Sequence, residues 1–189
     1  IRIPERIASL CCGTPWKSKG MVDGHAIMRE RVIAALHEAT DGGQLPVVVD
    51  ATSCTEGLAD LLAQEGITVL DATTFAETTL LPRLPSPRRV QSVVVHPTCS
   101  STRFGLNAVL MRLAAATAWE VIQPENWTCC AFAGDRGLLH PELTAAATAA
   151  EARSVRQVDA TAFVSANRTG ELGMTRATGR PFRHLLEVL

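Results

Sequence analysis

The sequence predicts an α/β fold of two pseudo-symmetric halves, with mainly parallel sheets flanked by helices. Three observations indicate this class. Strand-like runs of Val and Ile alternate with longer segments of helical periodicity, a vicinal cysteine pair occurs twice, and a proline-rich stretch lies between the two pairs. With 189 residues, 47% hydrophobic and 20% charged, the chain has the composition of an ordinary globular protein.

The alternation places four strands and four helices in order along the chain. The expected strands are "LPVVVDA", "GITVLDA", "VQSVVVHP" and "DATAFVSA", at 45–51, 66–72, 90–97 and 159–166. The expected helices lie at 24–40, 56–66, 104–118 and 141–155. The strand segments are continuously apolar, which is typical of parallel strands buried on both faces. Gly42, Gly43 and Gly66 are expected to end helices.

The segment "LLPRLPSPRRVQ" is expected to divide the chain. Pro82, Pro85 and Pro87 each lack a backbone donor and disfavour helix continuation. We therefore predict a first cysteine-rich half at 1–84 and a second at 85–189.

The two halves align on their cysteine pairs. When Cys11 and Cys12 are placed on Cys129 and Cys130, a helix, a strand-like run and a short segment follow in both halves. These short segments are "SCTEGL" and "TGELGM", and their alignment sets Cys54 opposite Gly170. The counterpart of Cys99 would precede Ile1, so we expect an N-terminal strand and cysteine in an unseen part of a longer parent chain.

Cysteine in this repeated pattern favours metal or cluster ligation. Neighbouring Cα atoms are about 3.8 Å apart, too close for an unstrained disulfide, so stapling is a poor explanation. Clustered thiolates repel one another unless a cation neutralises them, and all-sulfur ligation selects iron-sulfur clusters, zinc or Cu(I). A buried cysteine can also serve simply as a small apolar residue, but apolar packing gives no reason for matching offsets.

Both thiolates of a pair can address one site only if the backbone turns there. Gly13 permits such a turn in the first half, whereas Ala131 follows the second pair, with Gly134 three residues later, so that turn is expected to differ. Pro15 and Pro141 suit the starts of the following helices, whose N-termini would favour thiolate.

Several other functions have no support in the sequence. A net charge of −1, 4% aromatic residues and no Tyr argue against nucleic-acid binding. The apolar runs are far shorter than the roughly 20 residues of a membrane-spanning helix. No nucleotide-binding, esterase or zinc-protease motif occurs, and no base is identified that would make a cysteine a catalytic nucleophile, so no catalytic residue is predicted.

The chain resembles the CCG-type cysteine-rich domain family of heterodisulfide reductase and glycolate oxidase iron-sulfur subunits. The segments "LCCGTPWKSKG", "VVVDATSCTEGL", "VVVHPTCSSTRFG", "CCAFAGDRGLLHPELTAAAT" and "MTRATGRPF" carry the resemblance. They look most like the C-terminal part of FAD-linked oxidases of the D-lactate dehydrogenase type.

This resemblance implies an iron-sulfur (4Fe-4S) electron-transfer module within an oxidoreductase that oxidises a D-lactate-type or glycolate-type 2-hydroxy acid. The FAD would lie in an N-terminal domain of the same parent chain, and electrons would leave to a quinone or cytochrome. A cytoplasmic location, or a peripheral one at the inner face of the membrane, is expected. The implied ligands are Cys11, Cys12 and Cys54 in the first half and Cys99, Cys129 and Cys130 in the second.

The sequence departs from the family pattern at two positions. Ala51 stands where a C-x-x-C motif would begin, and Gly170 stands where a cysteine is expected. His96 and His140 are conceivable substitute ligands, although a strand-end role for His96 and an exposed helix-start role for His140 are favoured. Asp135 and Arg136 could hydrogen-bond to cluster sulfurs, grip a partner domain, or form an ordinary loop ion pair.

Two rival hypotheses follow, besides dithiol redox sensing, which ranks lower. One is a structural zinc module that carries no electrons. The other is a docking domain that has lost its cluster.

Overall fold

The computed structural model describes residues 1–85 and 89–189, and it has the α/β architecture that the sequence predicts. Its six strands in these ranges form two sheets, and every strand pair is parallel. The chain forms two compact units, Ile1–Ala72 and Thr73–Leu189. Within the two described ranges, no helix combines the length and apolar character needed to cross a membrane.

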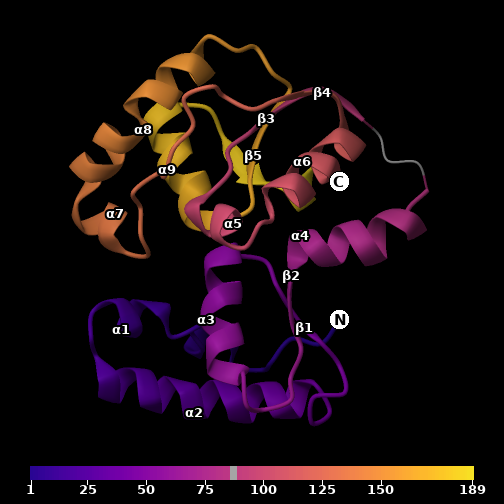
Figure 1. The fold of residues 1–189 in the computed structure, drawn as a ribbon, viewed down its shortest axis with the longest axis vertical. Coiled ribbons are helices and arrows are strands. Elements are labelled where there is room, and N and C mark those ends of the chain that lie inside the picture. Colours follow the sequence, from indigo (N-terminus) through magenta and orange to yellow (C-terminus); the bar gives the residue numbers. More distant parts are fainter. Residues whose placement is uncertain (86–88) are drawn as a thin grey trace. The chain divides into compact units, whose positions relative to one another are not determined.

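Unit 1, Ile1–Ala72, contains a two-stranded sheet covered by helices (Figure 1). Its elements are η1 Ile7–Ser9, α1 Thr14–Ser18, α2 Val22–Ala39, β1 Val47–Val49, α3 Thr52–Leu62 and β2 Val69–Asp71. Strands β1 and β2 pair in register from Val47 opposite Val69 to Val49 opposite Asp71, with α3 as the crossover between them.

The core of unit 1 lies between α2, α3 and the start of β2. Met28, Val32 and Leu36 recur at every fourth residue of α2, so they share one face of the helix. That face packs against Leu61 and Leu62 of α3. This packing fixes α3, which carries Cys54, against the rest of the unit.

Unit 2, Thr73–Leu189, contains a four-stranded sheet in the order β4-β3-β5-β6. The elements up to the sheet's edge strand are α4 Ala72–Phe75, the π-helix η2 Ala76–Leu80, η3 Leu81–Arg83, β3 Val90–Val95, α5 Cys99–Arg103, α6 Asn107–Thr117 and β4 Ala118–Ile122. The remaining elements are α7 Arg136–Leu139, α8 Pro141–Arg156, β5 Ala162–Ser165, α9 Arg168–Thr178, β6 Phe182–His184 and η4 Leu185–Glu187.

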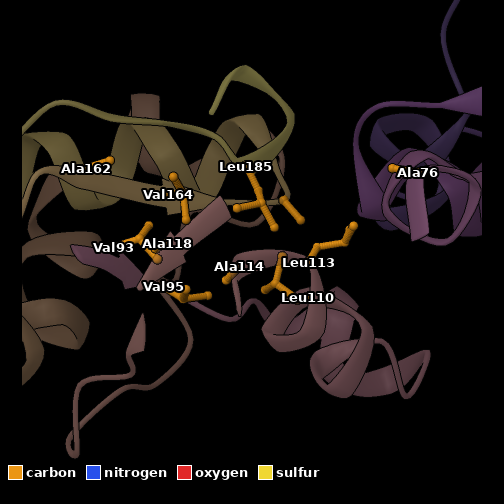
Figure 2. Close-up of a cluster of buried hydrophobic side chains, with 11 residues drawn as sticks. Ala76, Val93, Val95, Leu110, Leu113, Ala114, Ala118, Ala162, Val164 and Leu185 are labelled. Carbon is orange, nitrogen blue, oxygen red and sulfur yellow. The ribbon is translucent and has the colours of Figure 1, made fainter. Parts of the chain in front are cut away.

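Helices cover both faces of the unit 2 sheet, with α6 on one face and α8 and α9 on the other (Figure 1). Side chains alternate along β3. Val93 and Val95 face the α6 core, which Figure 2 shows, whereas Val94 faces Val155 of α8 and Met174 of α9. This two-sided burial explains why β3 is continuously apolar in sequence.

The predicted pseudo-symmetry is confirmed by the order of elements after each cysteine pair. In unit 1 the order is α1, α2, β1, α3, β2, and in unit 2 it is α7, α8, β5, α9, β6. The last three elements of each of these two series, β1-α3-β2 and β5-α9-β6, form a parallel β-α-β unit. All four expected strands are present, and β4 and β6 are two further strands that the sequence analysis did not identify.

Residues 73–84 pack within unit 2 in the structure. Ala76 belongs to the α6 core, and Glu77 forms an ion pair with Arg112 of α6. Pro82 lies in η3, whereas Pro87 lies outside the described residues. The predicted division of the chain into cysteine-rich halves at 1–84 and 85–189 stays a prediction.

Candidate functional site

The first three cysteines stand close to the N-termini of two helices in unit 1. Cys11 and Cys12 come directly before the turn that begins α1, and Cys54 is the third residue of α3, just after β1. Cys12 is buried, while Cys11 and Cys54 are partly exposed.

These three thiols interact with one another. A hydrogen bond from the Cys54 thiol lowers the pKa of Cys12 from 9.0 to about 5, and the Thr14 hydroxyl, 3.4 Å from Cys12 Sγ, adds to this effect. The same bond, followed by burial and the negative charges of Cys12, Cys11 and Asp50, raises the pKa of Cys54. Burial raises the pKa of Cys11. Near neutral pH, Cys12 is therefore the thiolate and Cys54 the thiol that donates to it.

The backbone after the first pair turns so that amide groups face the sulfurs. Gly13 has φ of +81°, in the left-handed region that glycine tolerates. The Gly13 N–H donates to Cys11 and the Thr14 N–H donates to Cys12, so each sulfur accepts from the residue two positions later. A Cβ at Gly13 would also lie 3.0 Å from two ring atoms of His25. Both backbone conformation and packing thus favour glycine here.

The second three cysteines occupy comparable places in unit 2. Cys99 is the first residue of α5, whose N-cap Thr98 forms a capping box with Ser101. Cys129 and Cys130 lie in the loop before α7. Cys130 is buried, whereas Cys99 and Cys129 are exposed. The second cysteine is therefore the buried member of each vicinal pair.

Hydrogen bonding between thiols recurs in unit 2 with a different pattern. A bond from Cys129 lowers the pKa of Cys130, and a bond with Cys129 is the largest cause that raises the pKa of Cys99. The charge of Cys99 acts in the opposite direction on Cys130 and raises its pKa. The thiol that helps the buried sulfur to ionise is thus its own neighbour in the pair.

The turn after the second pair begins with the same handedness as the first, although Ala131 takes the place of glycine. Ala131 has φ of +52°, and its N–H donates to Cys129 Sγ at 3.4 Å. The Phe132 N–H donates to Cys130, which repeats the pattern of unit 1. Positive φ is uncommon for a residue with a Cβ, so sequence alone gave no sign of it. The loop then diverges, because Ala133 and Gly134 also have positive φ before α7 begins.

In each unit, a glycine within a helix lies against the buried cysteine. A Cβ at Gly57 of α3 would be 2.5 Å from the Cys12 carbonyl oxygen and 3.1 Å from its Cβ. A Cβ at Gly173 of α9 would be 3.3 Å from the Cβ of Cys130. The sequence alignment paired these two glycines without a physical reason, and the structure provides one: each allows its helix to approach the cysteine turn closely.

Gly170 occupies the place in α9 that Cys54 occupies in α3, since each is the third residue of its helix. A Cβ at Gly170 would meet Ser165 Oγ at 3.0 Å, Thr98 Cγ2 at 3.1 Å and His96 Cδ2 at 3.5 Å. Space beside Gly170 is therefore already filled by neighbouring side chains.

His96 is buried with a partner that sequence reasoning did not identify. Its Nδ1 lies 2.7 Å from Oε1 of Glu151, and both side chains are fully buried. A glutamate on the buried face of an alanine-rich helix was the available signal, because it follows the buried Thr144 and Thr148 at helical spacing. The expected position of His96 at a strand end is confirmed, since it directly follows β3.

The other polar candidates lie at the starts of helices α7 and α8. His140 is the exposed N-cap residue of α8, as favoured from the sequence, and its Nδ1 lies 3.2 Å from Glu142 Oε1. Asp135 is the N-cap residue of α7 and Arg136 is its first residue. Contact of either with a cluster or a partner domain stays a prediction.

The donor chemistry fits a thiophilic metal or cluster, because the sulfurs are gathered in two hydrogen-bonded sets. The sulfurs of the vicinal pairs also lie on backbone turns that direct N–H groups at them. All six cysteines are free. In the two described ranges the sulfurs contact one another pairwise, and no group of three or more His, Cys, Asp or Glu side chains is arranged to enclose an ion. Their assignment as ligands therefore stays a prediction.

Fold and site together define an α/β cysteine-rich protein with duplicated vicinal thiol turns. Residues 93–172 match the family model of the cysteine-rich domain called CCG. This match confirms the resemblance to that domain over the segment that holds Cys99, Cys129 and Cys130. It suggests a metal-binding or iron-sulfur-binding module of the kind found in oxidoreductase subunits. A search of curated proteins gave no match.

Proposed function

We propose that this chain is the cysteine-rich iron-sulfur electron-transfer module of an FAD-linked 2-hydroxy-acid dehydrogenase of the D-lactate or glycolate type. The observation that supports this best is the repeated turn in which each sulfur of a vicinal pair accepts an N–H two residues later. Two halves with unlike sequences after the pair, Gly13 and Ala131, adopt this turn. Packing alone gives no reason to repeat it.

The six cysteines would hold the cluster atoms through their sulfurs, three in each half. Bound there, an iron-sulfur cluster would supply a reversible one-electron acceptor and donor. The protein's own contribution is electrostatic. Backbone N–H groups directed at the sulfurs favour the charged form of the thiols and, once a cluster is bound, its more negative reduced state. The buried positions of Cys12 and Cys130 limit access of water to that region.

The finer parts of the proposal come from the sequence resemblance. A flavin in an N-terminal domain of the parent chain would deliver electrons to this module, and a quinone or cytochrome would accept them. The module would then act in the cytoplasm or at the inner face of the membrane. The isolated chain is not expected to oxidise a substrate.

The test is the iron, acid-labile sulfide and zinc content of the full-length protein, purified without oxygen. We expect iron and sulfide in the parent, and a partial loss in either Cys12→Ser or Cys130→Ser, because each removes the buried ligand of one half. Ser18→Ala is a suitable control, since this exposed hydroxyl only donates to the Pro15 carbonyl. The proposal fails if the parent contains neither iron nor sulfide.

The same measurement separates the rival functions. Stoichiometric zinc that is lost on Cys12→Ser, without a redox-active chromophore, would replace the proposal with a structural zinc module. Absence of all three elements would favour a docking domain. Gly170 is the observation behind that alternative, because it removes a thiol from α9 and its surroundings are already filled.

A further inference from the structure

Unit 2 contains a fully buried carboxyl and imidazole pair. Glu151 of α8 and His96 after β3 are 55 residues apart in sequence, and their side chains meet at 2.7 Å without solvent exposure. Burying such a pair carries a large desolvation penalty, and apolar side chains of similar size often stabilise a core equally well. Stability alone therefore gives a weak reason for this pair.

Glu151 connects the pair to the vicinal cysteines. While Oε1 contacts His96, Oε2 accepts the backbone N–H of Thr128 at 3.4 Å. Thr128 directly precedes Cys129. The carboxylate thus reaches from α8 to the backbone of the loop that holds the second pair.

His96 connects the pair to the other cysteine-bearing segment. The backbone N–H of His96 donates to the Val164 carbonyl at 2.9 Å, and the backbone carbonyl of His96 accepts from Ser165 Oγ at 3.0 Å. Both backbone groups of His96 are therefore held by β5. Two residues later, Thr98 caps the helix that begins with Cys99. His96 is therefore held firmly within the segment that positions Cys99.

The imidazole has one further property that a purely packing role does not explain. Its Nε2 is buried and has no hydrogen-bond partner among the described residues. An unsatisfied buried polar atom costs free energy, so leucine in place of histidine would avoid that cost. The orientation of the ring is instead set by its Nδ1 contact with Glu151.

We propose that His96 and Glu151 are positioning residues for the second thiol site, which set the separation between Cys99 and Cys129. Glu151 bridges the two cysteine-bearing segments, to His96 on one side and to Thr128 on the other. This inference rests on the proposed function, because it concerns the same thiols as metal ligands. Its test does not require an iron-sulfur cluster, so the two can fail separately.

The probe is Cd²⁺ added to the reduced protein, followed by its ultraviolet thiolate charge-transfer band. Serine replaces Cys11, Cys12 and Cys54, so that the band reports unit 2 alone. In this background we expect Glu151→Ala to weaken Cd²⁺ binding about tenfold or more, the usual effect of removing a residue that orients a ligand. Glu151→Gln should keep most of the affinity, because its carbonyl can accept the Thr128 N–H while its amide donates to His96 Nδ1.

Three controls separate positioning from stability. Val155→Ala, one turn along α8, removes a fully buried apolar contact and should lower Tm without changing Cd²⁺ affinity. The double variant His96→Leu with Glu151→Leu should fold with an undiminished Tm and still bind Cd²⁺ weakly. In the converse background, with serine at Cys99, Cys129 and Cys130, Glu151→Ala should leave Cd²⁺ binding to unit 1 unchanged.

Unaltered Cd²⁺ affinity in folded Glu151→Ala, or in the double leucine variant, would overturn the positioning role. An equal loss of affinity in Val155→Ala would also overturn it, because the effect would then follow stability. Should Glu151→Ala fail to fold, the double leucine variant decides the question. A cadmium effect in a protein without iron or sulfide would support the positioning role while rejecting the proposed function.

Discussion

The two vicinal cysteine turns reach the same geometry with different residues. Gly13 adopts its positive φ without steric cost, whereas Ala131 adopts a similar conformation despite its Cβ. The left-handed region costs an L-residue about 1 to 2 kcal/mol, so the second turn is maintained against a penalty that the first avoids. Backbone direction, more than residue type, is what the two halves have in common.

The thiol networks differ more than the turns. In unit 1 the buried Cys12 depends on Cys54, a donor from α3, whereas in unit 2 the buried Cys130 depends on Cys129 beside it. Gly170 stands where α9 would have provided the equivalent of Cys54. With glycine at this position of α9, the buried sulfur of unit 2 is stabilised from within its own pair.

The largest expected effect tests this difference. In metal-free protein, Cys54→Ala should raise the pKa of Cys12 from about 5 toward 9.0, because its main hydrogen-bond donor is lost. In unit 2, Cys99→Ala should not raise the pKa of Cys130, since the charge of Cys99 already acts to raise it. Thiolate absorbance against pH measures both, and an unmoved Cys12 midpoint would contradict the assigned network.

The same pKa gives the sign of a pH effect on stability. The folded pKa of Cys12 lies below its ordinary value of 9.0. The stabilisation that its thiolate gives to the folded protein is therefore fully present above pH 9.0. The contribution declines as pH falls and is absent below about 5. Urea unfolding of metal-free unit 1 across this window should show a positive slope with pH that is reduced in Cys54→Ala.

The next largest effect is expected from alanine substitutions at the two glycines where α3 and α9 approach the cysteine turns. Gly57→Ala should destabilise unit 1 by about 3 kcal/mol, because the new Cβ would meet backbone, the Cys12 carbonyl oxygen, at 2.5 Å. Gly173→Ala should cost only about 1 kcal/mol, since its closest contact is 3.3 Å. Urea unfolding compares the two, and equal costs would show that the helices do not approach the turns as described.

A smaller effect is expected from the first turn itself. Gly13→Ala should destabilise by about 2 kcal/mol, because it combines positive φ with a 3.0 Å contact to the His25 ring. His25→Ala in the same background should recover part of the loss by removing that contact. Thermal unfolding monitored by circular dichroism provides the comparison, and a neutral Gly13→Ala would contradict the described turn.

The smallest expected effect is a gain in the free energy of unfolding, where the substitutions above cause a loss. Ala131→Gly should stabilise unit 2 by about 0.5 to 1 kcal/mol, because relief of the left-handed strain outweighs the greater unfolded-state entropy of glycine. Its φ of +52° and the hydrogen bond to Cys129 would be retained. A clear loss of stability on this substitution would show that the alanine methyl group has a packing role.

Sequence reasoning identified the parts of the fold that have a strong local signal. Runs of Val predicted β1 and β3, and the two cysteine pairs predicted the repeat. Strand β4 was missed because its sequence, "AWEVI", includes two exposed residues and follows directly on α6. Its first residue, Ala118, fell within the expected helix at 104–118, and no element was expected over the remaining four. Strand β6 has only three residues, too few to show a pattern of strand periodicity.

The site was predictable in composition but not in its supporting contacts. All six cysteines could be named, since their spacing is visible in the chain. The His96 contact with Glu151 joins residues from distant segments, and only the packing of α8 on the sheet brings them together. The positive φ of Ala131 was equally hidden, because a non-glycine residue gives no sequence sign of that conformation.

The amide donated to a cysteine sulfur in each half has a practical consequence for spectroscopy. The Gly13 N–H faces Cys11, and the Ala131 N–H faces Cys129. An amide proton held against sulfur shifts its resonance when the charge of that sulfur changes. A nitrogen-15 label on Gly13 and Ala131 would therefore give each half its own indicator, so that ionisation, oxidation or metal capture could be followed at the two sites independently in one sample.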